Sequence, residues 1–224
     1  MDDTTRFELF AFWRTSATYR VRVALNLKGL EASERYVDLD AGAQHGEAFR
    51  AINPMGAIPA LIDRQARDAP PLTQSLAILE FLEDIHPAAP ILPPSPHGRA
   101  RVRSLAAMLV ADTHPLITPR VVKYLTDTAH LDADAIRAWR THWFTTGLRA
   151  FEQRLAGEAE TGRFCHGDSV TMADICLASI RIVLPIFKIE VAGTPHVDRI
   201  FAACEAHPAF AKAAPSLQAG APRA

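Results

Sequence analysis

The chain has 224 residues and a formal net charge of −1, with 49% hydrophobic and 22% charged residues. This balance is typical of a folded globular protein rather than a disordered one, and the length suits one large domain or two ordinary ones. Basic residues are not in excess, and no apolar run approaches the length of about 20 residues that a membrane span needs. No apolar segment follows the acidic N-terminus, as a secretory signal would require. We therefore expect a cytoplasmic protein without nucleic-acid or membrane partners.

Strand and helix patterns alternate in the first part of the chain. Short apolar or alternating runs indicate strands, and longer runs with apolar residues at helical spacing indicate helices. Their order, β-α-β followed by two closely spaced strands and a helix, predicts a small α/β domain over residues 1–87. The expected strands are residues 7–11, 34–38, 60–63 and 71–73, and the expected helices are residues 16–28 and 75 to about 85.

A proline-rich segment divides the chain. Residues 86–96 contain five prolines, which cannot continue a helix and favour a stiff connection, so we expect a linker at residues 88–97. Beyond it no strand pattern is of comparable strength, which predicts an all-helical domain over residues 98–224. The expected helices there are residues 99–113, 133–155, 172–183, 197–206 and 209–214.

Three hydroxyl side chains, Thr15, Ser16 and Thr18, lie at the start of the first helix. The first N–H groups of a helix have no partner within it and carry about half a positive charge, which favours an anion. Simple N-capping is the alternative explanation. The first half of the chain contains no cysteine, so a nucleophile acting there must be a hydroxyl or must arrive with a ligand.

The Ile58–Pro59 step stands directly before an expected strand. Cis bonds occur in about 5–6% of X–Pro bonds and cluster in tight turns, so Pro59 is a candidate cis proline, with a trans turn as the alternative. A cis bond would present the N–H and C=O of Ile58 as an extended edge with which a peptide-like ligand pairs.

Two further helix starts carry polar signals. At Gln74–Ser75 the serine either caps the helix or offers its hydroxyl and N–H to a ligand carboxylate. Thr171 and Asp174 have the spacing of a capping box, which we interpret as a folding device. The three cysteines show no C-x-x-C spacing, so neither a disulfide framework nor a zinc site is expected, and Cys176 and Cys204 are expected in the core.

In this order and at these spacings, the segments resemble the glutathione transferase superfamily and, within it, the zeta class. The matching segments are Arg14–Leu25 (R-T-S-A-T-Y-R-V-R-V-A-L), Asn53–Leu61 (N-P-M-G-A-I-P-A-L), Gln74–Ser75 and Thr171–Asp174 (T-M-A-D). The resemblance covers about residues 7–218. It implies a thioredoxin-like N-terminal domain that binds glutathione, an all-α C-terminal domain and a homodimer.

The resemblance also implies roles for single residues. Thr15 stands where zeta enzymes have the serine regarded as activating the glutathione thiol, Ser16 matches the serine after it, and Ala17 replaces the family's cysteine. Ile58 would pair with the cysteinyl backbone of glutathione. The implied glutathione-binding residues are Ser16, Ala17, Gln44, Ile58, Pro59, Gln74 and Ser75, the last two holding the γ-glutamyl carboxylate.

On the substrate side, Arg14 and Arg120 match arginines that face substrate carboxylates, and Arg14 joins Thr15 and Ser16 as an implied catalytic residue. His114 lies in a segment that resembles the maleylpyruvate isomerases. Ile186 stands where the isomerases have an arginine, so a dicarboxylate would have one cationic anchor fewer or would use Arg181, which is otherwise expected to be a solvated surface residue.

Zeta enzymes are maleylacetoacetate isomerases of aromatic amino acid catabolism, and bacterial relatives isomerise maleylpyruvate. The implied function is therefore a glutathione-dependent cis–trans isomerisation of a maleyl keto acid, in which glutathione is regenerated. One alternative is a transferase that conjugates or dehalogenates small electrophiles, which needs only the glutathione site and an apolar pocket. Another is a non-enzymatic interaction module with the same fold.

Overall fold

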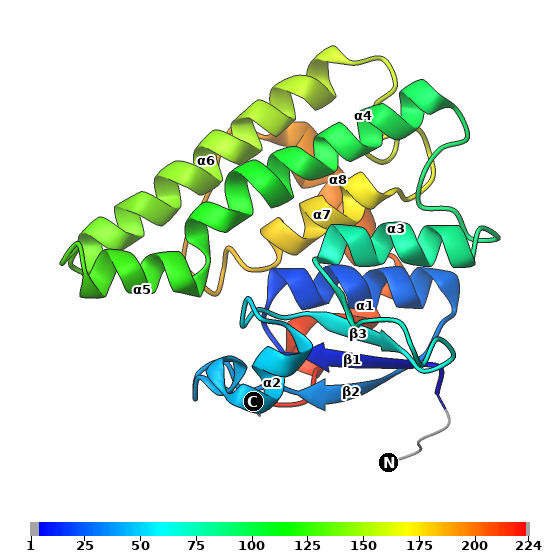
Figure 1. The fold of residues 1–224 in the computed structure, drawn as a ribbon. Coiled ribbons are helices and arrows are strands. Elements are labelled where there is room, and N and C mark those ends of the chain that lie inside the picture. Colours follow the sequence, from blue (N-terminus) through cyan, green and yellow to red (C-terminus); the bar gives the residue numbers. More distant parts are fainter. Residues whose placement is uncertain (1–4, 223–224) are drawn as a thin grey trace. The chain divides into compact units, whose positions relative to one another are not determined.

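The computed structural model describes residues 5–222, which form two compact units. The first unit holds residues 5–91 together with 206–222, and the second holds residues 92–205. Figure 1 shows the elements of each unit along the chain. None of the described helices has the length and apolar character that crossing a membrane requires.

The first unit is built on a mixed sheet with the strand order β2-β1-β3-β4. β1 pairs in parallel with β2 and antiparallel with β3, and β3 pairs antiparallel with β4. Helices α1 and α3 lie side by side on one face of this sheet (Figure 1), which is the predicted thioredoxin-like fold. The bounds are β1 Phe7–Ala11, α1 Ser16–Lys28, β2 Ala32–Tyr36, α2 Glu47–Ile52, β3 Ala60–Asp63, β4 Leu72–Thr73 and α3 Ser75–Ile85.

The second strand begins and ends two residues earlier than expected. Alternation around Tyr36 and Val37 predicted residues 34–38, but β2 pairs with the full length of β1, from Phe7 opposite Ala32 to Ala11 opposite Tyr36. Pairing with β1 therefore determines where β2 begins and ends. Tyr36 is 46% exposed, so its apolar ring was a misleading signal of burial.

The second unit contains no strand among its described residues, as the all-helical prediction requires. Its helices are α4 Pro96–Ala107, α5 Pro119–Asp127, α6 Ala133–Gly157, α7 Met172–Arg181 and α8 Pro195–Glu205. A π-helical turn, Met108–Thr113, and a 3-10 turn, His114–Ile117, connect α4 to α5. α5 was not expected from the sequence.

Gly147 explains how α6 packs closely against the π-helical turn. A Cβ atom on Gly147 would lie 2.1 Å from the Oγ1 atom of Thr113, so any other residue would push the two segments apart. Thr113 is buried and immediately precedes the turn that carries His114. The glycine thus allows α6 to approach the π-helical turn at Thr113.

The predicted capping box at the start of α7 is confirmed. Asp174 is fully buried, and its carboxylate accepts hydrogen bonds from Thr171 N, Thr171 Oγ1 and Cys165 N, each at 2.7 Å. Burial raises the pKa of Asp174, against the opposing effect of these bonds. All three cysteines are buried and none forms a disulfide, and burial raises the pKa of the Cys165 and Cys204 thiols, so they are core residues.

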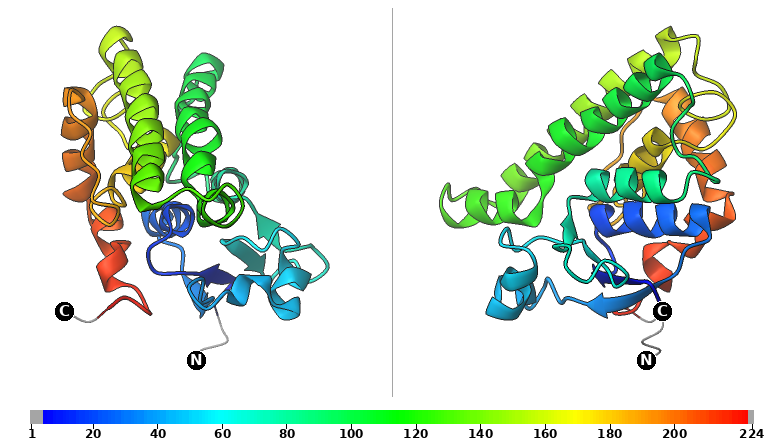
Figure 2. Two further views of the ribbon diagram at one scale, coloured as in Figure 1. Left: turned by 90° about the vertical axis from the view of Figure 1, so that its left-hand side faces the viewer. Right: turned by 45° about the vertical axis from the view of Figure 1, so that its right-hand side comes forward.

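The C-terminal segment packs with the first unit. Helix α9, Pro208–Lys212, lies beside α1 (Figure 2), and the side-chain amide of Asn26 donates a hydrogen bond to Ala209 O at 2.9 Å. Residues 206–222 are therefore grouped differently from the expectation of one helical domain over residues 98–224. The domain limits 1–87, 88–97 and 98–224 stay a prediction.

Candidate functional site

The turn between β1 and α1 places hydroxyl groups at a helix N-terminus. Thr15 is the N-cap of α1: its Oγ1 atom accepts a hydrogen bond from Thr18 N at 3.4 Å and lies 2.6 Å from Thr18 Oγ1. The first turn of α1 contains no acidic residue, so nothing there offsets the positive end of the helix dipole. Thr15 therefore caps the helix, as the simpler explanation predicted, and still leaves the turn suited to an anion.

Ser16 and Ala17 form the first turn of α1. Ser16 is 5% exposed, and its hydroxyl has no hydrogen-bond partner within the part of the chain that the structure describes. Ala17 is half-buried and offers only a methyl group where the resemblance places a cysteine. The hydroxyls of Thr15 and Ser16 are thus the groups of this turn that can donate to a bound anion.

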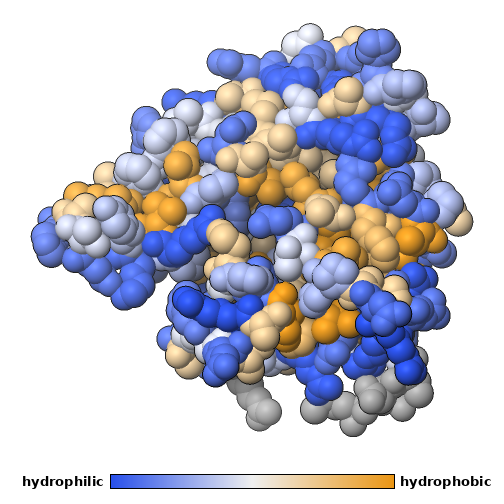
Figure 3. Space-filling view, viewed as in Figure 1, coloured by the Kyte–Doolittle hydropathy of each residue, from blue (hydrophilic) through white to orange (hydrophobic). Residues whose placement is uncertain are grey.

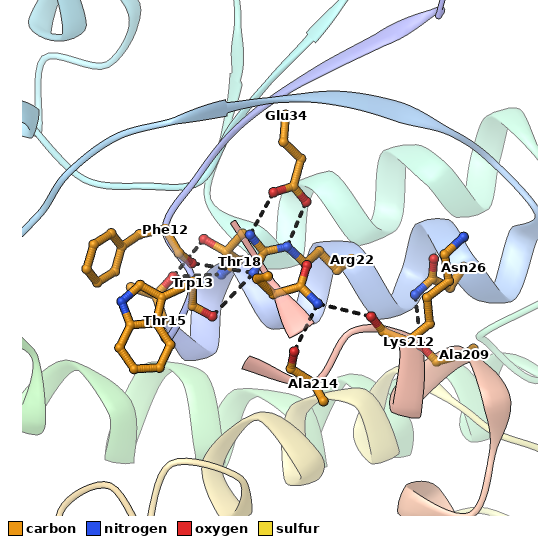
Figure 4. A network of polar contacts seen from close by, with 11 residues as sticks. Phe12, Trp13, Thr15, Thr18, Arg22, Asn26, Glu34, Ala209, Lys212 and Ala214 are labelled. Atoms are coloured by element: carbon orange, nitrogen blue, oxygen red, sulfur yellow. Dashed lines mark hydrogen bonds and ion pairs between the residues drawn. The ribbon is translucent and has the colours of Figure 1, made fainter. Parts of the chain in front are cut away.

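Arg22 connects the β1–α1 turn to the neighbouring strand β2 (Figure 4). Its guanidinium forms a two-pronged ion pair with Glu34 on β2, with both N–O distances 2.7 Å. The same guanidinium donates longer hydrogen bonds to Phe12 O at 3.4 Å and Trp13 O at 3.5 Å. Since planar arginine–carboxylate pairs fix orientation as well as distance, this pair ties the chain entering the turn to the edge of the sheet.

Arg14 lies in the same turn but is engaged on the surface. Its Nη2 atom is 2.5 Å from a carboxylate oxygen of Asp40, and its guanidinium stacks 5.4 Å from the rings of Phe12 and Trp13. Exposed ion pairs of this kind contribute little stability, so a ligand carboxylate can compete for Arg14. The predicted catalytic role of Arg14 requires that exchange.

At the start of α3, Gln74 and Ser75 meet a buried arginine from α1. Ser75 is 5% exposed, and its Oγ atom accepts a hydrogen bond from Arg20 Nε at 2.9 Å. Arg20 is 1% exposed. Gln74 has a φ of 66°, a backbone conformation that costs a residue other than glycine about 1–3 kcal/mol and is concentrated at ligand sites. The pair thus presents a hydroxyl with a cation behind it to a carboxylate.

The Ile58–Pro59 bond is cis, as predicted. The loop before it is fastened by Asn53, whose side-chain amide donates to Ala57 O at 2.5 Å and whose Oδ1 atom accepts from Met55 N at 3.2 Å. Within the described residues, the N–H and C=O of Ile58 have no backbone hydrogen bond. Ile58 therefore retains a free donor and a free acceptor for a peptide-like ligand.

Gln44 is brought against this loop. Gly56 has a φ of +57°, and a Cβ atom on it would lie 3.0 Å from Gln44 O, so the close approach requires glycine. The side-chain Oε1 atom of Gln44 is buried and has no hydrogen-bond partner among residues 5–222, whereas its Nε2 atom lies 3.1 Å from His45 Nε2. An unpartnered buried acceptor is rare and costly, which is consistent with a ligand N–H at this position.

His114 and Arg120 belong to the second unit. His114 is half-buried in the 3-10 turn before α5. Arg120 is exposed at the first turn of α5 and has no ion pair in the described part of the chain. A cation at a helix N-terminus is disfavoured by the helix dipole, so Arg120 is not explained by the stability of α5.

The two residues that bear on the missing anchor differ in environment. α7 ends at Arg181, before Pro185, and Ile186 is 40% exposed. Arg181 pairs with Asp198 at 2.7 Å, stacks 5.5 Å from the ring of Phe201, and has a side chain only 18% exposed. The interpretation of Arg181 as a solvated surface residue is wrong, because α8 supplies its carboxylate partner. Arg181 is therefore not a free replacement for the arginine missing at position 186.

Arg20 and Arg22 were not among the expected site residues. Each supports a residue that was: Arg20 lies behind Ser75, and Arg22 holds the turn before Thr15. Their signal in the sequence was charge at two positions of a helix that is otherwise apolar on several sides. That pattern is typical of a helix packed against other elements on several sides, but it does not indicate which residues would pair with the two arginines.

Comparisons with known proteins identify the family. Residues 16–85 match the family model described as the glutathione S-transferase N-terminal domain. The chain is 37% identical to a maleylpyruvate isomerase from Ralstonia sp over 94% of this chain and 98% of that protein.

Two solved structures are also similar. A maleylacetoacetate isomerase from Methylobacterium extorquens AM1 with bound malonate and glutathione is 48% identical, with a TM-score of 0.93 over 96% of this chain and 100% of that one. One from Anaeromyxobacter dehalogenans 2CP-1, with dicarboxyethyl glutathione and citrate in the active site, is 35% identical, with a TM-score of 0.86 over 98% and 99%. The chain belongs to the zeta class of the glutathione transferase superfamily.

Proposed function

We propose that this protein is a glutathione-dependent cis–trans isomerase of maleylacetoacetate or a related maleyl keto acid. The observation that carries the proposal is the β1–α1 turn, where the hydroxyls of Thr15 and Ser16 lie at a helix N-terminus without an acidic residue. The family supports it as well, since similar chains are named as isomerases of maleyl keto acids and similar structures bind glutathione or malonate.

The residues of the first unit fit glutathione group by group. Ile58 offers the unpaired N–H and C=O that a cysteinyl backbone needs, beside the buried Pro59. Ser75 and Gln74 would hold the γ-glutamyl carboxylate, with Arg20 adding positive charge behind them. Gln44 supplies the unpartnered acceptor for a ligand N–H. Ala17 would contact the ligand only through its methyl group.

The chain's own contribution to the reaction is electrostatic. When bound, glutathione supplies the thiolate that adds to the double bond and leaves again after rotation. Thr15 and Ser16 would donate hydrogen bonds that favour the anionic form of the sulfur, as does the end of α1. Arg14, released from Asp40, and Arg120 would hold the substrate carboxylate and the oxygen on which negative charge accumulates. The family resemblance assigns His114 to substrate binding as well.

A transferase that conjugates or dehalogenates small electrophiles is the second candidate. The favouring observation is Ile186, which leaves an exposed apolar side chain where the isomerases have an arginine. This reaction uses the same thiol-activating residues but consumes glutathione. We further propose a cytoplasmic homodimer, supported by the family resemblance. Light scattering of the purified protein tests the dimer.

The function is tested by following maleylacetone and maleylpyruvate with and without glutathione. The proposal predicts loss of the cis substrate only with glutathione present. A rate that does not depend on glutathione would contradict it. Binding of glutathione without turnover of either substrate, but with halide release from a chloroacetate, would favour the transferase. Failure to bind glutathione at all would leave only the non-enzymatic module.

A further inference from the structure

The helical unit contains a cavity of about 420 Å³ that the proposed reaction does not use. It lies between the end of α5, the first turns of α6 and the segment after α7. None of its lining residues is among those assigned to glutathione or to the keto acid. The lining residues are Thr126, Leu131, Asp132, Ala133, Ile136, Arg137, Arg140, Phe187, Lys188 and Ile189.

Arg140 is the most unusual member of this lining. Its Nε atom is buried and, within residues 5–222, has no hydrogen-bond partner, and the residue forms no ion pair there. Its guanidinium lies 4.5 Å from the ring centre of Phe187. Burial lowers the pKa of Arg140, because no carboxylate compensates for the lost hydration. Buried arginines normally have such a partner.

Two further cations line the same cavity. Arg137 lies one helical turn before Arg140 on α6, and its guanidinium donates one long hydrogen bond, 3.5 Å, to Lys188 O. Lys188 is exposed and has no ion pair in the described chain. Asp132 is the acidic residue of the lining, and its carboxylate accepts from Ala135 N at 2.8 Å as the N-cap of α6. Three positive charges thus face one negative charge that already caps a helix.

The rest of the lining is apolar. Leu131 contributes from the loop before α6, Ile136 from the first turn of α6, and Phe187 and Ile189 from the segment after α7. Figure 3 shows hydrophobic surface gathered at the end of the helical unit where α5 and the beginning of α6 lie in Figure 1, with hydrophilic surface beside it. An occupant that satisfies both kinds of wall carries an anionic group and an apolar body.

We propose that this cavity binds a small organic carboxylate with an apolar body. The carboxylate would accept hydrogen bonds from Arg140 and Arg137, and the apolar body would pack on Phe187 and Ile136. A guanidinium already stacked on an aromatic ring keeps its N–H edges free, so it is oriented for a carboxylate before the ligand arrives. The proposal is independent of the isomerase function, because the two sites share no residue.

The test is calorimetric titration of the whole protein, loaded with glutathione, with phenylacetate. The proposal predicts saturable binding that Arg140→Gln weakens at least tenfold, since bonds between arginine and a carboxylate are charge-assisted. Arg149→Gln is the matched control: Arg149 is an exposed arginine of the same helix outside the cavity, and its loss removes the same charge. Lys188→Gln is the second variant if Arg140→Gln impairs folding: Lys188 is exposed, and its loss should also weaken the binding of phenylacetate.

Two ligands separate charge from apolar contact. 2-Phenylethanol, which lacks the carboxylate, and inorganic phosphate, which lacks the apolar body, are both expected to bind at least tenfold more weakly than phenylacetate. Equal binding of either ligand would overturn the proposal, as would equal weakening by Arg149→Gln. Phenylacetate could instead compete completely with maleylacetone in the steady-state assay, equally in the original protein, Arg140→Gln and Lys188→Gln. That result would place the binding at the substrate site and would also overturn the proposal.

Discussion

Thr18 is expected to influence the thiol of bound glutathione although it is fully buried. In the structure, Thr15 Oγ1 donates a hydrogen bond to Thr18 Oγ1 at 2.6 Å, so this bond has to reverse before Thr15 can donate to a sulfur anion. If Thr15 donates its own proton to the thiolate, its oxygen is best satisfied by the proton of Thr18. Thr18 is therefore a positioning residue, and Thr18→Val, which keeps the shape of the side chain, removes only this support.

The expected change in the pKa of the thiol follows from two hydrogen bonds, the one from Thr15 to the thiolate and the one from Thr18 to Thr15. A hydrogen bond to a charged group is worth about 1.5–3 kcal/mol, and one pKa unit corresponds to about 1.36 kcal/mol, so Thr15→Ala should raise the pKa of the bound thiol by about 1–2 units. Thr18→Val removes a neutral bond of about 0.5–1.5 kcal/mol and should raise that pKa by less than about 1 unit. Thr15→Ala removes the long cap of α1, 3.4 Å, and also leaves the buried hydroxyl of Thr18 without its partner, so it should destabilise the fold by about 1–3 kcal/mol.

The assay is ultraviolet absorbance of the thiolate, titrated with glutathione bound. Thr15→Ser should restore the pKa of the original protein, because it restores the hydroxyl. The double variant Thr15→Ala with Ser16→Ala should show the largest increase. An unchanged thiol pKa in the double variant would mean that activation comes from elsewhere. A full increase in Ser16→Ala with none in Thr15→Ala would refute the assignment of the donor to Thr15.

Three further outcomes are expected. Ile186→Arg should improve kcat/KM for maleylpyruvate more than for maleylacetone, because it restores a cationic anchor; equal changes in steady-state assays would contradict this. Asn53→Ala should raise the KM for glutathione more than it lowers kcat, since it frees the loop before Ile58, and an unaltered KM would argue against that loop as a binding edge. The hydrogen bond from Arg6 lowers the pKa of Asp63, against the smaller opposing effect of burial. The stability from this pair is therefore present above the usual pKa of Asp and is lost as the pH falls through the lowered value. Chemical denaturation should show that Asp63→Asn loses less folding stability on acidification than the original protein.

The local sequence was sufficient for much of the fold. β1 and α1 were predicted to the residue, because Ser16 follows a capping threonine and Gly29 ends the helix with a φ of 64°. The capping box of α7 was likewise a local pattern. α5 was missed, since it is short and has no buried residue.

The site was predictable where backbone and caps create it. Thr15 and Ile58 could be named as candidate residues because a helix start and an Ile–Pro step carry local signals. The partners of Arg20, Arg22 and Arg181 were not predictable, since Ser75, Glu34 and Asp198 are distant in sequence and meet them only through packing. The grouping of residues 206–222 with the first unit has the same cause, because the contact of α9 with α1 is long-range.

The proposed function makes glutathione a catalyst, which acts on a cis double bond and is regenerated. The most direct measurement is a proton NMR time course with maleylacetone in large excess over glutathione. We expect complete conversion to the trans isomer, fumarylacetone, while the free glutathione signal is unchanged at the end. Conversion that stops when one equivalent of glutathione has been consumed, with a thioether as the product, would contradict it.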